Sequence, residues 1–208
     1  MTRASKPHDF APKKQPSQER AQATFDALVE ACTWLLPRRG YAGATTNHIA
    51  RRAGVNIASL YEYFPGKDAI VAQVAERLVE RVLGRLETGA AELARARERD
   101  AVRRWIELIH DTVARERELV AVFLNQIPYT NQLEPIRAIG ARLVELSQNV
   151  QTRAGGSGRG VLSGASLHLL INLVTSTIMQ IVQDPPQDLT QRALLDELTR
   201  RVESWGRL

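Results

Sequence analysis

The residues with the most chemistry to offer lie between positions 45 and 67. Thr45 and Thr46 precede one short apolar pattern, and Asn56 and Ser59 open a second. Hydroxyl and amide side chains at the starts of helices suit hydrogen bonds to phosphate oxygens and to the edges of nucleic-acid bases. This stretch therefore predicts recognition of a polyanion rather than bond-making chemistry.

The sequence holds no arrangement typical of catalysis or metal binding. Its histidines are scattered without ligand spacing, and its single cysteine, Cys32, excludes an internal disulfide and a thiolate zinc cluster. Cys32 falls on an apolar helical stripe, which favours a buried thiol. The glycine-rich residues 154–160 follow no strand and lack the lysine of a phosphate-binding loop. We therefore expect no enzyme activity, no cofactor and no metal.

Positive charge is concentrated at the N-terminal end of the chain. The 208 residues have a net charge of +5. Residues 1–67 contain ten basic and five acidic residues, a difference of 10 − 5 = +5, so residues 68–208 are neutral. A basic segment on a neutral body is typical of a protein that binds a polyanion. Residues 1–17 show no periodicity, and we expect them to form a disordered basic arm.

Apolar spacing predicts three short helices around the polar residues. Apolar side chains recur with a helical period from residue 18 to Gly40, where the first helix is expected to end. Thr46 is expected to cap the second helix, Gly54 to supply a left-handed turn, and Asn56 to cap the third helix. Such a pair of helices is a helix-turn-helix, whose second helix enters the major groove of DNA. The residues expected to point outwards from that helix are Ser59, Tyr61, Glu62 and Tyr63.

Short motifs at fixed spacing run through this region without a gap. They are Gly40-Tyr41, Thr45-Thr46, Ile49-Ala50, Ala53-Gly54-Val55, Ser59, Leu60-Tyr61, Tyr63-Phe64 and Lys67. Over about residues 18–75 the chain resembles the DNA-binding domain of the TetR (tetracycline-repressor) family of transcriptional regulators. The resemblance implies an N-terminal helix-turn-helix domain of three helices, followed by a helical body that binds an effector and forms a dimer.

The resemblance also assigns contacts to individual residues. It implies that the paired threonines and the lysine meet phosphate, that the start of the third helix faces base edges, and that two tyrosines contact the DNA backbone. The DNA-binding residues predicted in this way are Thr45, Thr46, Asn56, Ile57, Ala58, Ser59, Tyr61, Tyr63 and Lys67. Ile57 and Ala58 stand where the family often has a polar residue or glycine, so we expect methyl contacts with thymine there.

The rest of the chain also has a helical period, which predicts an all-α protein with about nine helices. A long helix from residue 67 to about 99 is expected to break near Gly84 or Gly89. A helix is expected from residue 100 that runs on or restarts through residues 119–124 and stops before Pro128. Further helices are expected over 134–151, over 161–183 and from residue 188 or 190. We divide the chain into a disordered arm (1–17), a helix-turn-helix domain (18–66) and an effector-binding and dimerisation domain (67–208).

The helical body is expected to hold a small-molecule effector, as the resemblance implies. The candidate lining is an apolar pocket with a few polar groups, and ordinary core packing is the alternative for each residue. These candidates are Trp105, Phe123, Asn125, Gln126, Tyr129, His168, Asn172, Thr175 and Met179.

The segment from Gly160 to Gln183 carries no charged residue but is too polar for a lipid-facing span, so we expect a helix between protein surfaces. It has an apolar stripe and a second, more polar stripe, so we expect two protein neighbours, for which a partner copy on one face and the domain interior on the other are candidates. The resemblance implies that the last two helices pair with their symmetry mates. The predicted dimer residues are Leu167, Leu170, Ile171, Val174, Ile178, Leu195, Leu198 and Val202.

These features lead to two functional hypotheses. The first is a homodimeric repressor of transcription that a small molecule releases from a palindromic DNA operator. The alternative is a helical interaction protein that binds DNA without sequence preference and has no effector. No apolar stretch follows Arg3 and Lys6, so we expect no signal peptide, a cytoplasmic location and no membrane partner.

Overall fold

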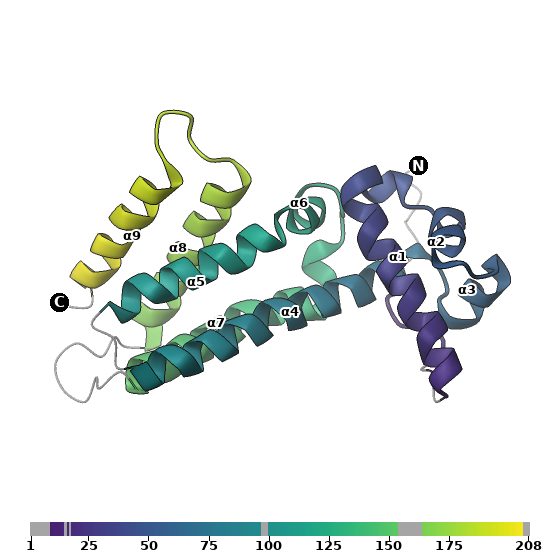
Figure 1. Ribbon diagram of the computed structural model, residues 1–208, viewed down its shortest axis with the longest axis horizontal. Coiled ribbons are helices and arrows are strands. Elements are labelled where there is room, and N and C mark those ends of the chain that lie inside the picture. Colours follow the sequence, from purple (N-terminus) through teal and green to yellow (C-terminus); the bar gives the residue numbers. More distant parts are fainter. Residues whose placement is uncertain (1–8, 15, 17, 97–99, 154–163, 206–208) are drawn as a thin grey trace, which may run out of the picture. The chain divides into compact units, whose positions relative to one another are not determined.

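The computed structural model describes residues 9–14, 16, 18–96, 100–153 and 164–205. Within these ranges it has nine α-helices, one 3-10 turn and no strand, which confirms the all-α prediction (Figure 1). The elements are α1 (Glu19–Gly43), α2 (Thr46–Ala53), α3 (Ile57–Tyr63), α4 (Lys67–Ala96), α5 (Ala101–Arg115), α6 (Arg117–Asn125), η1 (Thr130–Gln132), α7 (Glu134–Arg153), α8 (Gly164–Gln183) and α9 (Gln191–Trp205). The glycine-rich residues 154–160 lie outside the described residues.

The helices form two compact units. Unit 1 contains the described residues up to Leu78 together with Glu118–Ile136, and unit 2 contains Val79–Arg117 and the described residues from Arg137 onwards. The sequence placed a domain boundary at residue 67, whereas the first turns of α4 belong to unit 1. There Ala69, Ile70 and Val74 have no exposed surface, so the start of α4 is part of the core.

The core of unit 1 is built where α1 packs against α2 and α3. Leu28 and Cys32 of α1 are fully buried, and the ring of Phe25 stacks 4.7 Å from the ring of Phe64. The predicted buried thiol is confirmed, and burial raises the pKa of Cys32 to about 12. The thiol is therefore a small apolar core group, because a thiolate would not form near neutral pH.

The regular part of α1 stops at Gly40, as predicted, because Gly40 has the non-helical φ 67 and ψ 173. One further helical turn follows across this kink, so α1 reaches Gly43. A Cβ atom at Gly40 would lie only 2.6 Å from the side-chain oxygen of Gln126, and its φ is one that other residues rarely adopt. Gly40 therefore permits both the kink and the close approach of Gln126.

The predicted break in α4 is wrong. The helix runs without interruption for 30 residues through Gly84 and Gly89. A helical glycine costs only about 1 kcal/mol, which packing can offset. A Cβ atom at Gly89 would lie 2.3 Å from a methyl carbon of Leu108, so the glycine lets α5 approach α4 closely within unit 2.

In unit 2, α8 packs against α5 and α9, as Figure 1 shows. Among the described residues, α8 is the one helix long and apolar enough to cross a membrane, with a mean hydropathy of 1.5 over 18 residues. Its apolar stripe is nevertheless buried against its neighbours, as expected for a core helix. The buried residues are Leu167, Leu170, Ile171, Val174, Ile178, Ile181 and Val182.

Glu116 joins α4 to the end of α5 within unit 2. Its carboxylate accepts two hydrogen bonds of 3.0 Å from the guanidinium of Arg81 and one of 3.4 Å from Arg85. The side chain of Glu116 is only 13% exposed. The hydrogen bonds from Arg81 lower the pKa of Glu116 below its ordinary value, although burial partly opposes this effect.

Replacing Glu116 with glutamine is expected to cost about 1 kcal/mol of stability at neutral pH and to remove a pH dependence. The folded-state pKa is depressed, so the stabilisation is present above the ordinary value of 4.5 and is lost as the pH falls below it. Thermal unfolding of both proteins across the acidic range tests this. The unfolding temperatures of the wild type and Glu116→Gln should converge as the pH becomes acidic. The exposed control Glu118→Gln should follow the wild type at every pH. If the difference in unfolding temperature between the wild type and Glu116→Gln is the same at every pH, the pH-dependent stabilisation by Glu116 is contradicted.

Candidate nucleic-acid interface

The turn between α2 and α3 has the geometry that the sequence predicted. Gly54 has φ 71 and ψ 24, in the left-handed region that favours glycine. Its backbone N–H donates to the carbonyl of Arg51, and the N–H of Val55 donates to the carbonyl of Ala50 at 3.0 Å. These bonds end α2 and redirect the chain, so α3 starts at a fixed angle to α2.

Both helices of the motif begin with a side-chain cap, but one cap is a residue earlier than predicted. Thr45, not Thr46, caps α2, because its hydroxyl accepts a hydrogen bond of 3.3 Å from the N–H of His48. Asn56 caps α3 as predicted, and its side-chain oxygen accepts a 2.9 Å bond from the N–H of Ala58. Thr46 is free of the capping role, and its hydroxyl lies 3.2 Å from the hydroxyl of Tyr61.

The two tyrosines of α3 have different surroundings. Tyr61 is 43% exposed, as predicted. Tyr63 was predicted to point outwards and is instead buried, because its ring packs edge-on against Phe25 at a centroid distance of 6.2 Å. Leu60 lies on the same inner side and has no exposed surface. The outer side of α3 thus carries one tyrosine rather than two.

The structure brings the nine residues predicted to bind DNA together within unit 1. Apart from Tyr63, all have side chains that are exposed or half-buried. The exposed ones are Thr45, Asn56, Ala58 and Tyr61, and the half-buried ones are Thr46, Ile57, Ser59 and Lys67. Small or polar side chains and one aromatic ring on a short capped helix can hydrogen-bond and make apolar contacts within a DNA groove.

Unit 1 also contains a polar network that the sequence did not reveal. The carboxylate of Asp68, in the first turn of α4, accepts hydrogen bonds from the hydroxyls of Tyr41 at 2.6 Å and Tyr129 at 2.8 Å. The side chain of Gln126 accepts a 3.0 Å bond from the N–H of Tyr41. Burial and the bond to Asp68 raise the pKa of Tyr41 to about 12, and burial also raises the pKa of Tyr129 above its ordinary value. Both tyrosines therefore stay protonated donors.

Lys67 is tied to the same network. Its ammonium donates a 2.8 Å hydrogen bond to the carbonyl of Tyr41 and lies 3.6 Å above the centre of that ring. Burial lowers the pKa of Lys67, and the charge of Asp68 partly opposes this shift. A lysine has three N–H donors, and the bond to Tyr41 uses one of them. The half-buried side chain keeps donors for a phosphate while its position is held.

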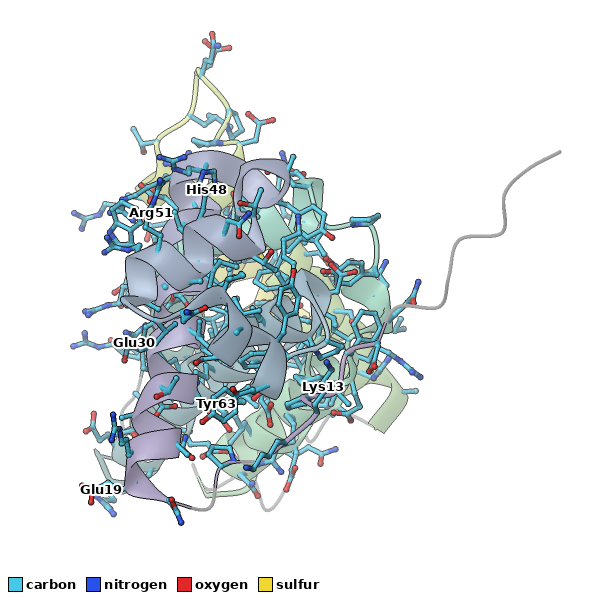
Figure 2. All side chains as sticks on the ribbon, turned by 90° about the vertical axis from the view of Figure 1, so that its right-hand side faces the viewer. Lys13, Glu19, Glu30, His48, Arg51 and Tyr63 are labelled. Carbon is cyan, nitrogen blue, oxygen red and sulfur yellow. The ribbon has the colours of Figure 1, made fainter. Side chains whose placement is uncertain are left out.

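Additional positive charge lies on α1 and α2. The guanidinium of Arg52 stacks 3.5 Å from the ring centre of Trp34, and Arg38 approaches the same ring at 4.2 Å. Figure 2 shows His48 and Arg51 on α2, and Arg51 is exposed. This charge agrees with the polyanion-binding surface expected from the distribution along the sequence.

The residues predicted to line an effector pocket fall into both units. Phe123, Asn125, Gln126 and Tyr129 belong to unit 1, where Gln126 and Tyr129 take part in the polar network. The others belong to unit 2: Trp105, His168, Asn172, Thr175 and Met179. Trp105 is buried and donates to the hydroxyl of Ser147 at 3.3 Å, whereas His168 and Asn172 are exposed.

The predicted dimer residues of α8 are buried within unit 2 itself, whereas those of α9 are half-buried. The large apolar side chains that α8 leaves exposed are Leu169 at 63% and Leu173 at 51%. These two leucines were not predicted to be at an interface, because they lie on neither of the two stripes identified in this segment of the sequence. An open pocket of about 530 Å³ also lies between α8 and α9 and includes Ile181, Leu194 and Leu198.

The N-terminal part of the chain matches a described protein family. Residues 26–74 match "Bacterial regulatory proteins, tetR family". The chain is 29% identical over 72 residues to the probable HTH-type transcriptional regulator YttP of Bacillus subtilis, a match that covers 35% of each protein. It is 35% identical over 80 residues to the uncharacterised HTH-type transcriptional regulator Rv0767c of Mycobacterium tuberculosis, covering 38% of this chain and 36% of that protein. The matches thus span about a third of the relatives' length.

The fold as a whole is similar to solved regulators. A putative TetR-family transcriptional regulator from Mesorhizobium loti superimposes with a TM-score of 0.69 at 15% identity, covering 90% of this chain and 97% of that one. The fatty acid degradation regulator FadR from Bacillus halodurans gives a TM-score of 0.64 at 14% identity, covering 90% and 95%. At these identities the likeness establishes the fold.

Proposed function

We propose that this chain is a regulator of the TetR family, which its residues 26–74 match, and that it binds a palindromic DNA operator as a homodimer and represses transcription there. The supporting observation is the outer side of α3. This helix follows the left-handed Gly54, is capped by Asn56, and presents small and polar side chains with Tyr61 at the basic end of the chain. A helix with these properties fits the major groove as the recognition helix.

Within this proposal, the side chains have separate roles. Thr45, Thr46 and Lys67 position the protein on phosphates, and the side chains at positions 56–59 contact base edges. Tyr61 contacts the backbone or a sugar from the exposed end of α3. Because Tyr63 is buried, it takes part through packing under the helix rather than as an open donor.

A homodimer explains the apolar surface that α8 leaves uncovered. Leu169 and Leu173 are exposed on α8, and Trp205 is exposed at the end of α9. Pairing of α8 and α9 with a second copy buries these side chains and gives the complex a two-fold axis. Two recognition helices related by this axis read the two halves of a near-palindrome.

A small-molecule effector completes the proposal. Polar and sulfur-containing side chains follow one stripe of α8, namely His168, Asn172, Thr175 and Met179, and Trp105 lies in the same unit. We assign effector recognition to this stripe and a cytoplasmic location to the protein. Titrating compounds against a preformed complex with DNA tests the effector: a binder that contacts this stripe should weaken DNA affinity, whereas one that leaves DNA affinity unchanged counts against release.

Selection from random double-stranded DNA tests the proposed function. The full-length protein should enrich one inverted repeat, with half-sites about 10 base pairs apart from centre to centre or a multiple of this spacing. If the protein retains DNA but enriches no sequence, the alternative of binding without sequence preference holds instead. If it retains no DNA, both assignments fail.

A further inference from the structure

A short N-terminal segment crosses unit 1 and connects two of its parts. We call residues 10–13 the N-terminal strap. Its first residue, Phe10, packs against Tyr129, with ring centres 5.0 Å apart and an angle of 44° between the planes. Its last residue, Lys13, contacts the end of α3 at Tyr63, and Figure 2 labels both residues. The strap belongs to the stretch that the sequence predicted to be a disordered arm.

Lys13 makes two hydrogen bonds with the last turn of α3. Its backbone N–H donates to the carbonyl of Tyr63 at 2.7 Å, and its ammonium donates to the carbonyl of Tyr61 at 3.1 Å. The last carbonyls of a helix have no partner within the helix, and a cation near them interacts favourably with the helix dipole. Lys13 therefore supplies both a donor and a positive charge at the C-terminal end of α3.

The recognition helix needs such support because it is short. α3 has seven residues, and a helix of this length is unstable unless other groups hold it. Its N-terminal end is capped by Asn56. Within the helix itself, the N–H of Phe64 donates to the carbonyl of Leu60, and the chain then becomes extended at Phe64. The hydrogen bonds from Lys13 therefore satisfy the carbonyls of Tyr61 and Tyr63, which follow the Leu60 carbonyl in the helix.

The other end of the strap is anchored in the polar network. Tyr129, on which Phe10 packs, is 1% exposed and donates its hydroxyl to Asp68. Asp68 also holds Tyr41. The strap is thus fixed at Phe10 to a rigid buried group and at Lys13 to α3.

From these contacts we infer that Lys13 is a positioning residue for the recognition helix. Its ammonium fixes the C-terminal end of α3 instead of serving mainly as a DNA-phosphate contact, and Phe10 holds the strap in place for this task. The inference rests on the proposed function, in which α3 reads base edges. Reading bases requires the helix at a defined depth and angle, whereas attraction to phosphates tolerates small movements. Loss of Lys13 should therefore reduce discrimination between DNA sequences.

The first test does not require DNA. Amide hydrogen exchange of the full-length protein should be faster in α3 for Lys13→Ala than for the wild type, because the C-terminal turn opens more often. Lys14 is exposed and carries the same charge one residue further on, so Lys14→Ala is the matched control. Lys13→Arg keeps the cation and its donors and should restore wild-type exchange. If α3 exchanges equally in Lys13→Ala and Lys14→Ala, the positioning role is overturned.

The second test compares a duplex selected from random DNA with a mixed-sequence duplex of the same length. Lys13→Ala should lower the ratio of the two affinities by about fivefold to tenfold, the scale of one ordinary, solvent-exposed hydrogen bond. Lys14→Ala should change both affinities by the same factor and leave the ratio intact, and Lys13→Arg should restore it. Phe10→Ala should also lower the ratio of the two affinities. The double variant should lower this ratio by less than the product of the two single fold-changes, because both residues belong to one strap.

The outcomes separate the inference from the function on which it rests. Failure to select any sequence contradicts the proposed function, while amide exchange still decides whether Lys13 holds α3. If a sequence is selected but Lys13→Ala weakens both duplexes equally, the proposed function stands. Lys13 is then a phosphate contact, and the positioning role is wrong.

Discussion

Replacing Asp68 with alanine is expected to lower the free energy of unfolding by about 3 kcal/mol. The variant removes the acceptor of two tyrosine hydroxyls, from Tyr41 at 2.6 Å and from Tyr129 at 2.8 Å. Hydrogen bonds to a charged group are stronger than neutral ones, and a buried donor left without an acceptor adds a desolvation cost. Tyr129 is 1% exposed, so its hydroxyl depends on partners within unit 1.

Urea unfolding followed by circular dichroism measures this change. Tyr129→Phe removes one hydroxyl but keeps the acceptor and should cost about 1 kcal/mol. Asp68→Asn keeps an oxygen acceptor without the charge and should fall between these two variants. Asp188→Ala, an exposed aspartate between α8 and α9, should have almost no effect. A loss well below 1 kcal/mol for Asp68→Ala would show that the network does not stabilise unit 1.

Replacing Tyr61 with alanine is expected to weaken binding to the selected DNA by about a hundredfold. Loss of a sugar or phosphate contact costs about 1.5 kcal/mol, and a homodimer carries two copies, so the total is about 3 kcal/mol. Folding should be little affected, because the side chain is 43% exposed and contributes little to the core. Fluorescence anisotropy with a labelled duplex measures the affinity, and thermal unfolding checks the fold.

The hydroxyl and the ring of Tyr61 can be separated by a second variant. Tyr61→Phe keeps the ring but removes the hydroxyl, which lies 3.2 Å from that of Thr46. If the hydroxyl donates to the DNA backbone, this variant should lose most of the affinity that alanine loses. If instead the ring packs on a sugar, Tyr61→Phe should retain most of the wild-type affinity for the selected DNA. Wild-type affinity for both variants would exclude Tyr61 from the interface.

The helix-turn-helix was predictable because its determinants are local. A left-handed glycine and a capping asparagine two residues later act within one turn of chain, so Gly54 and Asn56 were identified from the sequence. The cap of α2 was misplaced by one position because Thr45 and Thr46 are adjacent hydroxyls of equal capping ability. Tyr63 was misjudged because its burial depends on Phe25, which a reading of α3 alone does not include.

The polar network and the strap were not predictable, because they join residues far apart in the chain. Tyr129 lies 61 positions from Asp68, and Gln126 lies 85 positions from Tyr41. No spacing rule relates such residues. The sequence therefore assigned Gln126 and Tyr129 to effector binding, whereas the structure gives both of them hydrogen-bond partners in unit 1. In α8, periodicity identified the buried stripe but not which neighbouring helix covers it.

In the proposed complex, side chains on α3 read bases while residues around them hold phosphates. The most direct test is to repeat the selection from random DNA with Ser59→Ala and with Lys67→Ala. Ser59→Ala should enrich a repeat altered at the same position in both halves, since one base contact is worth about 1–3 kcal/mol. Lys67→Ala should enrich the wild-type repeat at lower affinity. If both variants select the unaltered wild-type repeat, or if both alter it, α3 does not read the sequence in the way described.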